Sequence, residues 1–125
     1  GTVFAAFNAV INSHSHARFA SQCALAMRDA LEDMSPPVSV LIGIHTCNVL
    51  AGNIGTVHAA TYNILGPGVA LSCILSRLNK PLRTQILITE STHSRISEHF
   101  VMRGVDVVDF AGESMKVHEL VQEVD

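Results

Sequence analysis

Histidine is the first side-chain type in this sequence that could do chemistry, because the 125-residue chain carries seven of them. His14 and His16 form the closest pair, but no carboxylate or thiol follows them at the spacing of a metal-ligand set. His45 lies in an apolar run typical of a strand, which favours a core histidine bonded to backbone. The residue pattern therefore predicts a solvated loop at His14 and His16, and no metal site.

The three cysteines, Cys23, Cys47 and Cys73, are the candidate nucleophiles and disulfide partners. They are odd in number, widely spaced and embedded in apolar sequence such as QCALAM and LSCIL. None lies among basic residues that would favour the reactive thiolate. This pattern predicts reduced, buried thiols that pack as small hydrophobic groups, and an intracellular (cytoplasmic) compartment.

Two glycine-containing segments could supply backbone amides to a phosphate: GNIGT at 52–56 and LGPG at 65–68. The second precedes an expected helix, whose N-terminal amides and dipole favour anions. Sharp turns require the same glycines, so turn chemistry is the simpler interpretation of either segment taken alone. The sequence contains no GxGxxG, GxxxxGK[ST] or GxSxG motif.

The first half of the framework is predicted from its hydrophobic pattern. The apolar run at 2–9 predicts a central strand covered on both faces. Three- and four-residue apolar spacing predicts a helix over 13–34, with Ser15 as its N-cap. Segments 38–45 and 48–54 are interpreted as neighbouring strands of one hairpin. The expected buried side of the helix comprises Phe19, Cys23, Ala26, Met27, Ala30, Leu31 and Met34.

The second half alternates in the same way. A helix is expected from Gly68 until the NKP stretch at 79–81, followed by a short buried strand at 85–89. Next come a helix over 91–99 and a closing hairpin of 103–110 with 116–121, joined through the turn AGES. The expected order is β α β β α β α β β.

Composition excludes several classes of protein. The formal charge is −3, the eight basic residues are scattered, aromatic residues make up 5% and tryptophan is absent, so no nucleic acid partner is expected. The longest apolar run is far below the roughly 20 residues of a spanning helix, and the first residues do not resemble a signal peptide. We therefore expect no membrane segment in this chain.

Four stretches occur in order along nearly the whole chain: IGIHTCNVLAGNIGT, TYNILGPGVALSCILSRLNK, ILITEST and FAGESMKVHEL. They resemble the catalytic domain of class III adenylate and guanylate cyclases, whose pattern includes GIHTG, AGNIG, YT..GD.VN.A.RL...NK, ILIS and V.G...PV.VYEL. The resemblance implies a ferredoxin-like α/β (α+β) sandwich that lacks the family's first strand and helices. It also implies one N-terminally truncated, partial homology domain over residues 1–125 and a head-to-tail dimer with active sites at the interface.

The family's reactive positions carry other residues here. Cyclisation of a nucleoside triphosphate uses two divalent cations, Mg²⁺ or Mn²⁺, held by two aspartates. One aspartate belongs to the lacking segment, and Gly1 and Thr2 stand where the other is expected. Ala70 replaces the ribose-orienting asparagine, Ile74 replaces the charge-stabilising arginine, and Glu113 aligns with the phosphate-facing lysine. The resemblance therefore implies that no catalytic position is intact.

Other positions keep part of the binding chemistry. Tyr62, Asn63 and Gly66 align with the family's nucleotide-binding segment, and Asn63 can still donate and accept hydrogen bonds to a purine edge. The aspartate that follows the glycine in the family has become Pro67, and the second glycine of GIHTG has become Cys47. Together these positions form the outline of a nucleotide site.

Three functions stay open on this basis. The leading hypothesis is a degenerate, inactive cyclase domain without a cofactor. It would act as a dimerisation or regulatory module in cyclic-nucleotide signalling, as a homodimer or a heterodimer with another cyclase-type domain, within a parent protein that could be membrane-anchored. The second is a working cyclase that converts ATP or GTP once the lacking segment or a partner chain completes it. The third is a metal-independent nucleotide sensor that bonds a base through Asn63, Tyr62 and Asn53.

Overall fold

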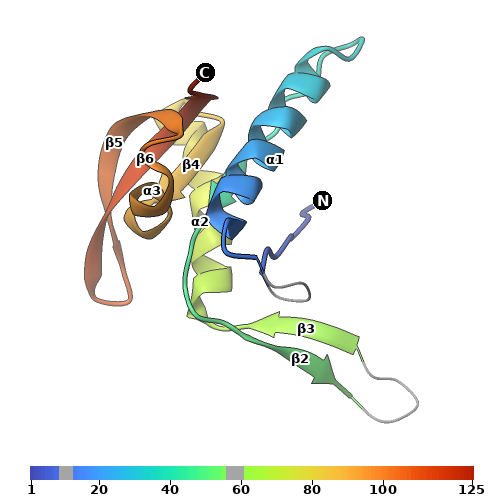
Figure 1. Cartoon of the computed structure of the whole chain (residues 1–125), viewed down its shortest axis with the longest axis vertical. Coiled ribbons are helices and arrows are strands. Elements are labelled where there is room, and N and C mark those ends of the chain that lie inside the picture. Colours follow the sequence, from blue (N-terminus) through green and yellow to red (C-terminus); the bar gives the residue numbers. More distant parts are fainter. Residues whose placement is uncertain (9–12, 56–60) are drawn as a thin grey trace.

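The computed structural model describes residues 1–8, 13–55 and 61–125, and this part of the chain holds three helices and six strands (Figure 1). The elements are α1 (His16–Glu32), β1 (Ile42–Ile44), β2 (Leu50–Ile54), β3 (Thr61–Leu65), α2 (Pro67–Leu82), β4 (Ile86–Thr89), α3 (Glu90–Ile96), β5 (Phe100–Phe110) and β6 (Glu113–Glu123). The predicted mixed α/β (α+β) class is confirmed.

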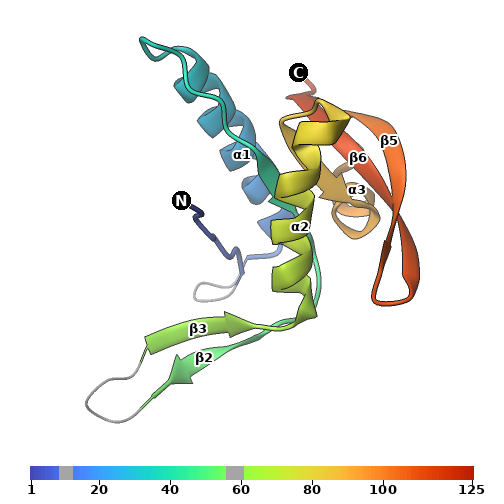
Figure 2. The ribbon, with the colours of Figure 1, turned by 180° about the vertical axis from the view of Figure 1, so that it is seen from behind.

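One mixed sheet forms the body of the molecule. Its strand order is β1-β4-β6-β5, with β1 parallel to β4 and the other neighbours antiparallel. Strands β2 and β3 form a separate antiparallel hairpin, which projects away from this body in both views (Figures 1 and 2). We call this hairpin the arm.

Two hydrophobic clusters lie on opposite faces of the sheet, and both include residues of β4. Ile86 and Ile88 pack with α1, α3, β5 and β6, whereas Leu87 packs with α2 and with Val117 of β6. All four residues of β4 are buried. Successive side chains of a strand point to opposite faces, so β4 contributes side chains to both clusters.

Helix α2 packs closely on β1 because position 43 has no side chain. A Cβ atom added at Gly43 would lie 2.3 Å from the Ser72 carbonyl oxygen and 2.6 Å from the Ser76 nitrogen. At the far end of α2, the Asn79 amide donates to the Ile42 carbonyl at 2.9 Å. Gly43 and Asn79 therefore fix the position of α2 against the sheet.

The predicted first helix is confirmed as α1, with Ser15 at its N-cap position, but the Ser15 side chain makes no capping hydrogen bond. The predicted buried side is wrong. Phe19, Cys23, Met27 and Met34 are exposed, and the buried residues of α1 are Ala17, Ser21, Ala24 and Leu25. Small side chains allow a helix to approach its neighbours closely. Three- and four-residue spacing fits both the predicted face of α1 and the face that is buried, so the spacing alone does not distinguish them.

The predicted central strand at 2–9 is wrong for its described part. Residues 2–8 form no strand, and Val3 is 91% exposed and Phe4 61% exposed. A strand needs a hydrogen-bonded neighbour, and none of the described strands pairs with this segment. Ala9, the last residue of the prediction, lies outside the described residues.

The predicted hairpin of 38–45 with 48–54 is also wrong. Strand β1 is only three residues long and pairs with β4, whereas β2 pairs with β3, a strand that the sequence pattern had not indicated. The partner of β1 is distant in sequence, and hydrophobic alternation carries no information on such a pairing. The order of elements is therefore α β β β α β α β β.

The closing hairpin is confirmed and is longer than predicted. Strands β5 and β6 run over Phe100–Phe110 and Glu113–Glu123, so the turn shortens to Ala111 and Gly112. Both turn residues have positive φ, 51° and 82°. Two successive residues in this conformation are typical of a type I′ hairpin turn.

The second and third helices and the strand between them are also confirmed. Helix α2 continues through Pro81 to Leu82, a little beyond the predicted end. None of the helices in the described part of the chain combines the length and apolarity needed to cross a bilayer.

Candidate functional site

The expected nucleotide-binding residues lie along β3 and at the start of α2. Tyr62 and Asn63 are in β3, opposite Asn53 and Gly52 of β2. Gly66 follows at the N-cap of α2 with φ of 144°, a backbone conformation that favours glycine. The fold thus places Tyr62 toward the far end of the arm, Asn63 at its middle, and Gly66 at its base beside α2.

The outward face of α2 carries the two positions expected to be catalytic. Ala70 and Ile74 are one helical turn apart and both exposed, with Ile74 at 37%. Leu71 and Leu75, the residues that follow each of them, are buried against the sheet. Neither a methyl nor a sec-butyl group can donate a hydrogen bond or carry charge, so this face cannot bind a ribose hydroxyl or a phosphate through these side chains.

Glu113 lies apart from these residues. It is exposed at the first position of β6, where it pairs with Phe110 across the turn of the β5–β6 hairpin. Within one chain, the residues implied by the resemblance therefore fall into two groups on different elements. The resemblance aligns this exposed carboxylate with a phosphate-facing lysine, so the charge at this position is reversed relative to the family pattern.

His45 lies behind the first turn of α2. A Cβ added at Gly68 would be 2.1 Å from Cys47 Sγ and 3.2 Å from His45 Cδ2, so both side chains pack against the helix there. His45 Nδ1 is hydrogen-bonded to Thr89 Oγ1 at 2.7 Å. The expected bond to backbone is thus replaced by one to a side chain, and burial lowers the pKa of His45 from its ordinary 6.5.

The cysteines are free, as predicted, but they are less buried than predicted. Cys23 and Cys47 are exposed and Cys73 is half-buried. Cys23 is exposed because it belongs to the outward stripe of α1. Partial burial raises the pKa of Cys47, which disfavours its thiolate and hence a nucleophilic role.

The sequence predicts that His14 and His16 do not form a metal site. His14 lies in a shallow hollow with Arg18 and Arg95, and Arg95 Nη1 is 3.5 Å from His16 Nε2. Basic neighbours repel a metal cation, but His16 is the first residue of α1 and is half-buried, so the predicted solvated loop is wrong for this residue.

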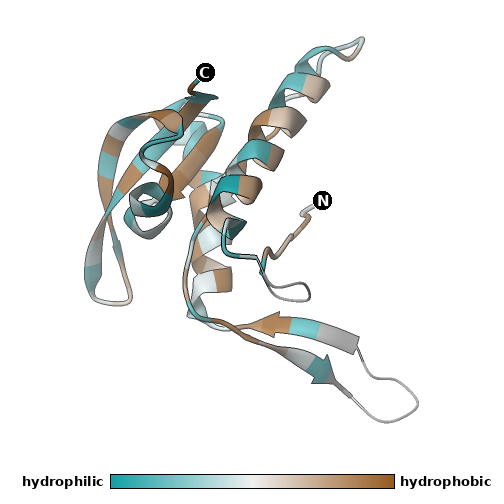
Figure 3. Ribbon diagram, viewed as in Figure 1, coloured by the Kyte–Doolittle hydropathy of each residue, from teal (hydrophilic) through white to brown (hydrophobic). Residues whose placement is uncertain are grey.

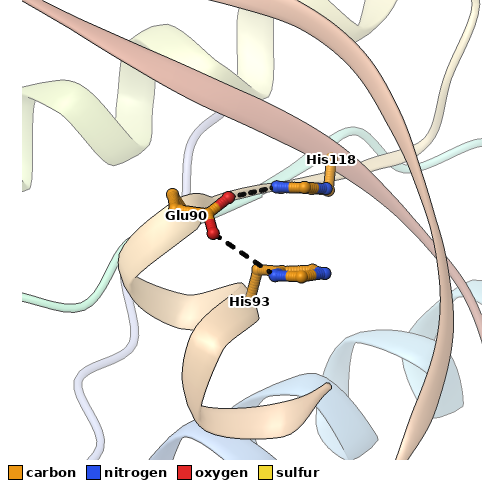
Figure 4. Close-up of side chains that lie close together, drawn as sticks. All are labelled: Glu90, His93 and His118. Atoms are coloured by element: carbon orange, nitrogen blue, oxygen red, sulfur yellow. Dashed lines mark hydrogen bonds and ion pairs between the residues drawn. The ribbon is translucent and has the colours of Figure 1, made fainter.

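A different cluster was not indicated by the sequence pattern. Glu90 and His93 of α3 meet His118 of β6 (Figure 4), and one ligand atom from each lies within 4.8 Å of the others. The Glu-x-x-His spacing at 90–93 places two of these side chains on one helix face, and it is the one signal that could have indicated them. His118 comes from a strand that sequence spacing does not connect to α3.

The cyclase reaction that the resemblance implies uses two divalent cations held by aspartates. Within residues 1–8, 13–55 and 61–125, the only group of three or more potential ligands is Glu90, His93 and His118. Mg²⁺ and Mn²⁺ prefer oxygen ligands, and two of these three ligands are imidazoles. Gly1 and Thr2, which the resemblance places where an aspartate is expected, are both exposed. Glu90, His93 and His118 are therefore a poor fit to the cyclase cation pair.

Comparison with solved structures identifies the fold. The guanylate cyclase domain of RhGC from Catenaria anguillulae, solved in complex with GTP, superposes with a TM-score of 0.74 at 20% identity, over 94% of this chain and 66% of that one. The dimeric guanylyl cyclase domain of the RhoGC fusion protein from Blastocladiella emersonii gives 0.73 at 19% identity, over 94% and 65%. The fold is that of class III nucleotide cyclase domains, as the resemblance implied.

Sequence comparison agrees with the fold. Adenylate cyclase 1 of Rhizobium meliloti (strain 1021) is 26% identical over 130 residues, which cover 96% of this chain and 20% of that protein. Residues 1–122 match the family model of the adenylate and guanylate cyclase catalytic domain. The chain belongs to this family. It spans about one fifth of the length of the curated relative and about two thirds of the solved domains.

Proposed function

We propose that residues 1–125 are a single, partial and degenerate cyclase domain, which does not cyclise a nucleoside triphosphate by itself. It acts as a dimerisation or regulatory module in cyclic-nucleotide signalling. The observation that carries the proposal is the outward face of α2, where the exposed residues Ala70 and Ile74 have no polar side-chain atom. The family resemblance assigns ribose orientation and charge stabilisation to these two positions.

The expected decrease in catalytic rate from the two replaced side chains supports inactivity. Removing one preorganised donor to a developing charge costs about 10²- to 10³-fold in rate, so two independent losses amount to about 10⁴- to 10⁶-fold. Gly1 and Thr2, which carry no carboxylate, stand where the resemblance expects one of the two cation-holding aspartates. The reverse charge of Glu113 would further weaken the binding of a triphosphate.

Exposed apolar side chains at the base of the arm support association with another domain. Leu50 and Leu65 pair across the arm and are 71% and 45% exposed. Figure 3 shows hydrophobic residues on both strands of the arm near its junction with α2. Burial of such side chains is a main source of association free energy. The partner would be a second copy of this chain or another cyclase-type domain.

Inactivity is tested by incubating the purified chain with ATP or GTP and either Mg²⁺ or Mn²⁺, and measuring cyclic nucleotide by mass spectrometry. We expect no product above that of the heat-inactivated chain. Product that rises with enzyme concentration would refute the proposal and favour a working cyclase. Saturable binding of an ATP or GTP analogue that a chelator does not change would favour a sensor instead.

Association is tested by sedimentation equilibrium. If the chain self-associates through the arm, Leu50→Asp should weaken the dimer at least about 10-fold, because a carboxylate would have to be buried. The matched control is Val107→Asp on β5, where the native side chain is 58% exposed and outside the arm. Equal effects of both variants would contradict a role for the arm.

A further inference from the structure

The cluster of Glu90, His93 and His118 lies on the face of the sheet opposite α2. Its β6 member, His118, directly follows Val117, which packs in the α2 cluster, so the pleat turns His118 to the other face. Glu90 and His93 come from α3, which covers that face. Neither the cyclase reaction nor the proposed association uses these side chains.

The three side chains lie close together, with the two imidazole rings parallel and the Glu90 carboxylate beside them (Figure 4). His118 Nε2 is 2.5 Å from one carboxylate oxygen of Glu90, and His93 Nδ1 is 3.7 Å from the other. The two imidazole rings are stacked, with centroids 3.9 Å apart and planes inclined by 9°. Each ring therefore directs one nitrogen toward the same carboxylate.

One of these nitrogens is not satisfied by the protein. His93 Nδ1 is shielded from solvent and has no hydrogen-bond partner among the described residues. At 3.7 Å, the Glu90 oxygen is too distant for a hydrogen bond. A buried polar atom without a partner is uncommon and costs stability. A cation between the carboxylate and the two rings would satisfy this nitrogen.

We propose that Glu90, His93 and His118 form a Zn²⁺ site. Two imidazole nitrogens and one carboxylate oxygen suit zinc, whereas Mg²⁺ and Ca²⁺ favour oxygen ligands throughout. Bonds of about 2.0–2.2 Å in a tetrahedral site place ligand atoms about 3.4 Å apart. The present atoms lie within 4.8 Å of one another, and Glu90 and His118 are only 2.5 Å apart, so side-chain rotations would have to separate this pair and bring the wider ones closer.

The inferred role of the ion is to link α3 to β6. The two elements are separated in sequence by β5, and these three ligands would join them through metal bonds in addition to packing. Three protein ligands leave a fourth position for water or for a group from another molecule. This proposal is independent of whether the domain cyclises a nucleotide.

Zinc binding is tested by titrating Zn²⁺ into the purified full chain in competition with a chromogenic chelator. We expect one ion per chain with a Kd of about 1 µM or tighter. Glu90→Gln, His93→Gln and His118→Gln should each weaken binding at least about 100-fold, since loss of even an outer-sphere partner costs about 10- to 100-fold. His14→Gln, a histidine outside the cluster, should bind zinc as the native chain does.

A second measurement separates loss of the site from loss of the fold. Each variant is unfolded thermally with EDTA and again with zinc. We expect zinc to raise the midpoint of the native chain and of the His14 variant, and to leave the three cluster variants unchanged. Absence of a stoichiometric ion, or a zinc-induced shift that persists in the folded His118→Gln chain, overturns the proposal.

Discussion

Replacing Gly43 by alanine tests how closely α2 packs on β1, which decides where the outward face of α2 lies. The added methyl group would lie 2.3 Å from the Ser72 oxygen and 2.6 Å from the Ser76 nitrogen. Both are backbone atoms of α2, so relief requires a shift of the helix and not a side-chain rotation. Overpacking of this kind costs about 1–3 kcal/mol, and the backbone contacts place this case toward the upper part of that range.

The expected decrease in the free energy of unfolding is therefore about 2 kcal/mol, after allowing for the small gain from a less flexible unfolded chain. Urea denaturation followed by circular dichroism measures it. With an m-value of about 2 kcal/mol/M, the midpoint should fall by about 1 M. The matched control is Gly52→Ala in β2, where an added Cβ meets nothing within 4 Å. Its free energy of unfolding should change by less than about 1 kcal/mol.

Unfolding of Gly43→Ala at the same urea concentration as the native chain would contradict the close contact between α2 and β1. Equal destabilisation of Gly52→Ala would also contradict it, because the cost would then be a general one for replacing glycine in a strand. A large loss at Gly43 alone confirms the close contact.

Three further predictions concern stability, each measured by denaturation. Asn79→Leu should lower the free energy of unfolding by about 1–3 kcal/mol, because it removes the buried donor to the Ile42 carbonyl. Burial lowers the pKa of His45 below its ordinary 6.5, so the folded state favours the neutral imidazole. The free energy of unfolding should therefore fall as the pH drops below 6.5, and it should fall less in His45→Gln. Thermal melting at a series of pH values measures both. Ala111→Asn should stabilise the chain by up to about 1 kcal/mol, because asparagine tolerates the φ of 51° that precedes Gly112 better than alanine does; no gain would contradict the type I′ assignment.

Local patterns predicted the elements that are defined by their own residues. The continuous apolar stretch that includes Ile86 and Ile88 predicted a buried strand, and all four residues of β4 are buried. Helical periodicity from Gly68 onward predicted α2, which begins one residue earlier, at Pro67. These features depend on neighbouring residues in the chain, and a sequence pattern records such neighbours directly.

Features that depend on distant neighbours could not be predicted in the same way. The exposed Val3 and Phe4 belong to a run that is apolar enough for a central strand, but apolarity does not supply a pairing partner. The pairing of Ile42 with Ile86 is likewise a long-range choice. For the site, the resemblance identified Ala70 and Ile74, whereas the contact between α3 and His118 exists only in the folded chain.

The position of β4 determines how this molecule comes apart. Its backbone is hydrogen-bonded to β1 on one side and to β6 on the other, while Leu87 and Ile88 pack into different hydrophobic clusters. If β4 separates from its neighbouring strands, both hydrophobic clusters lose packed side chains at the same time. The layers on the two faces of the sheet should therefore unfold as one cooperative unit, and the β4 amides should be among the slowest to exchange with deuterium.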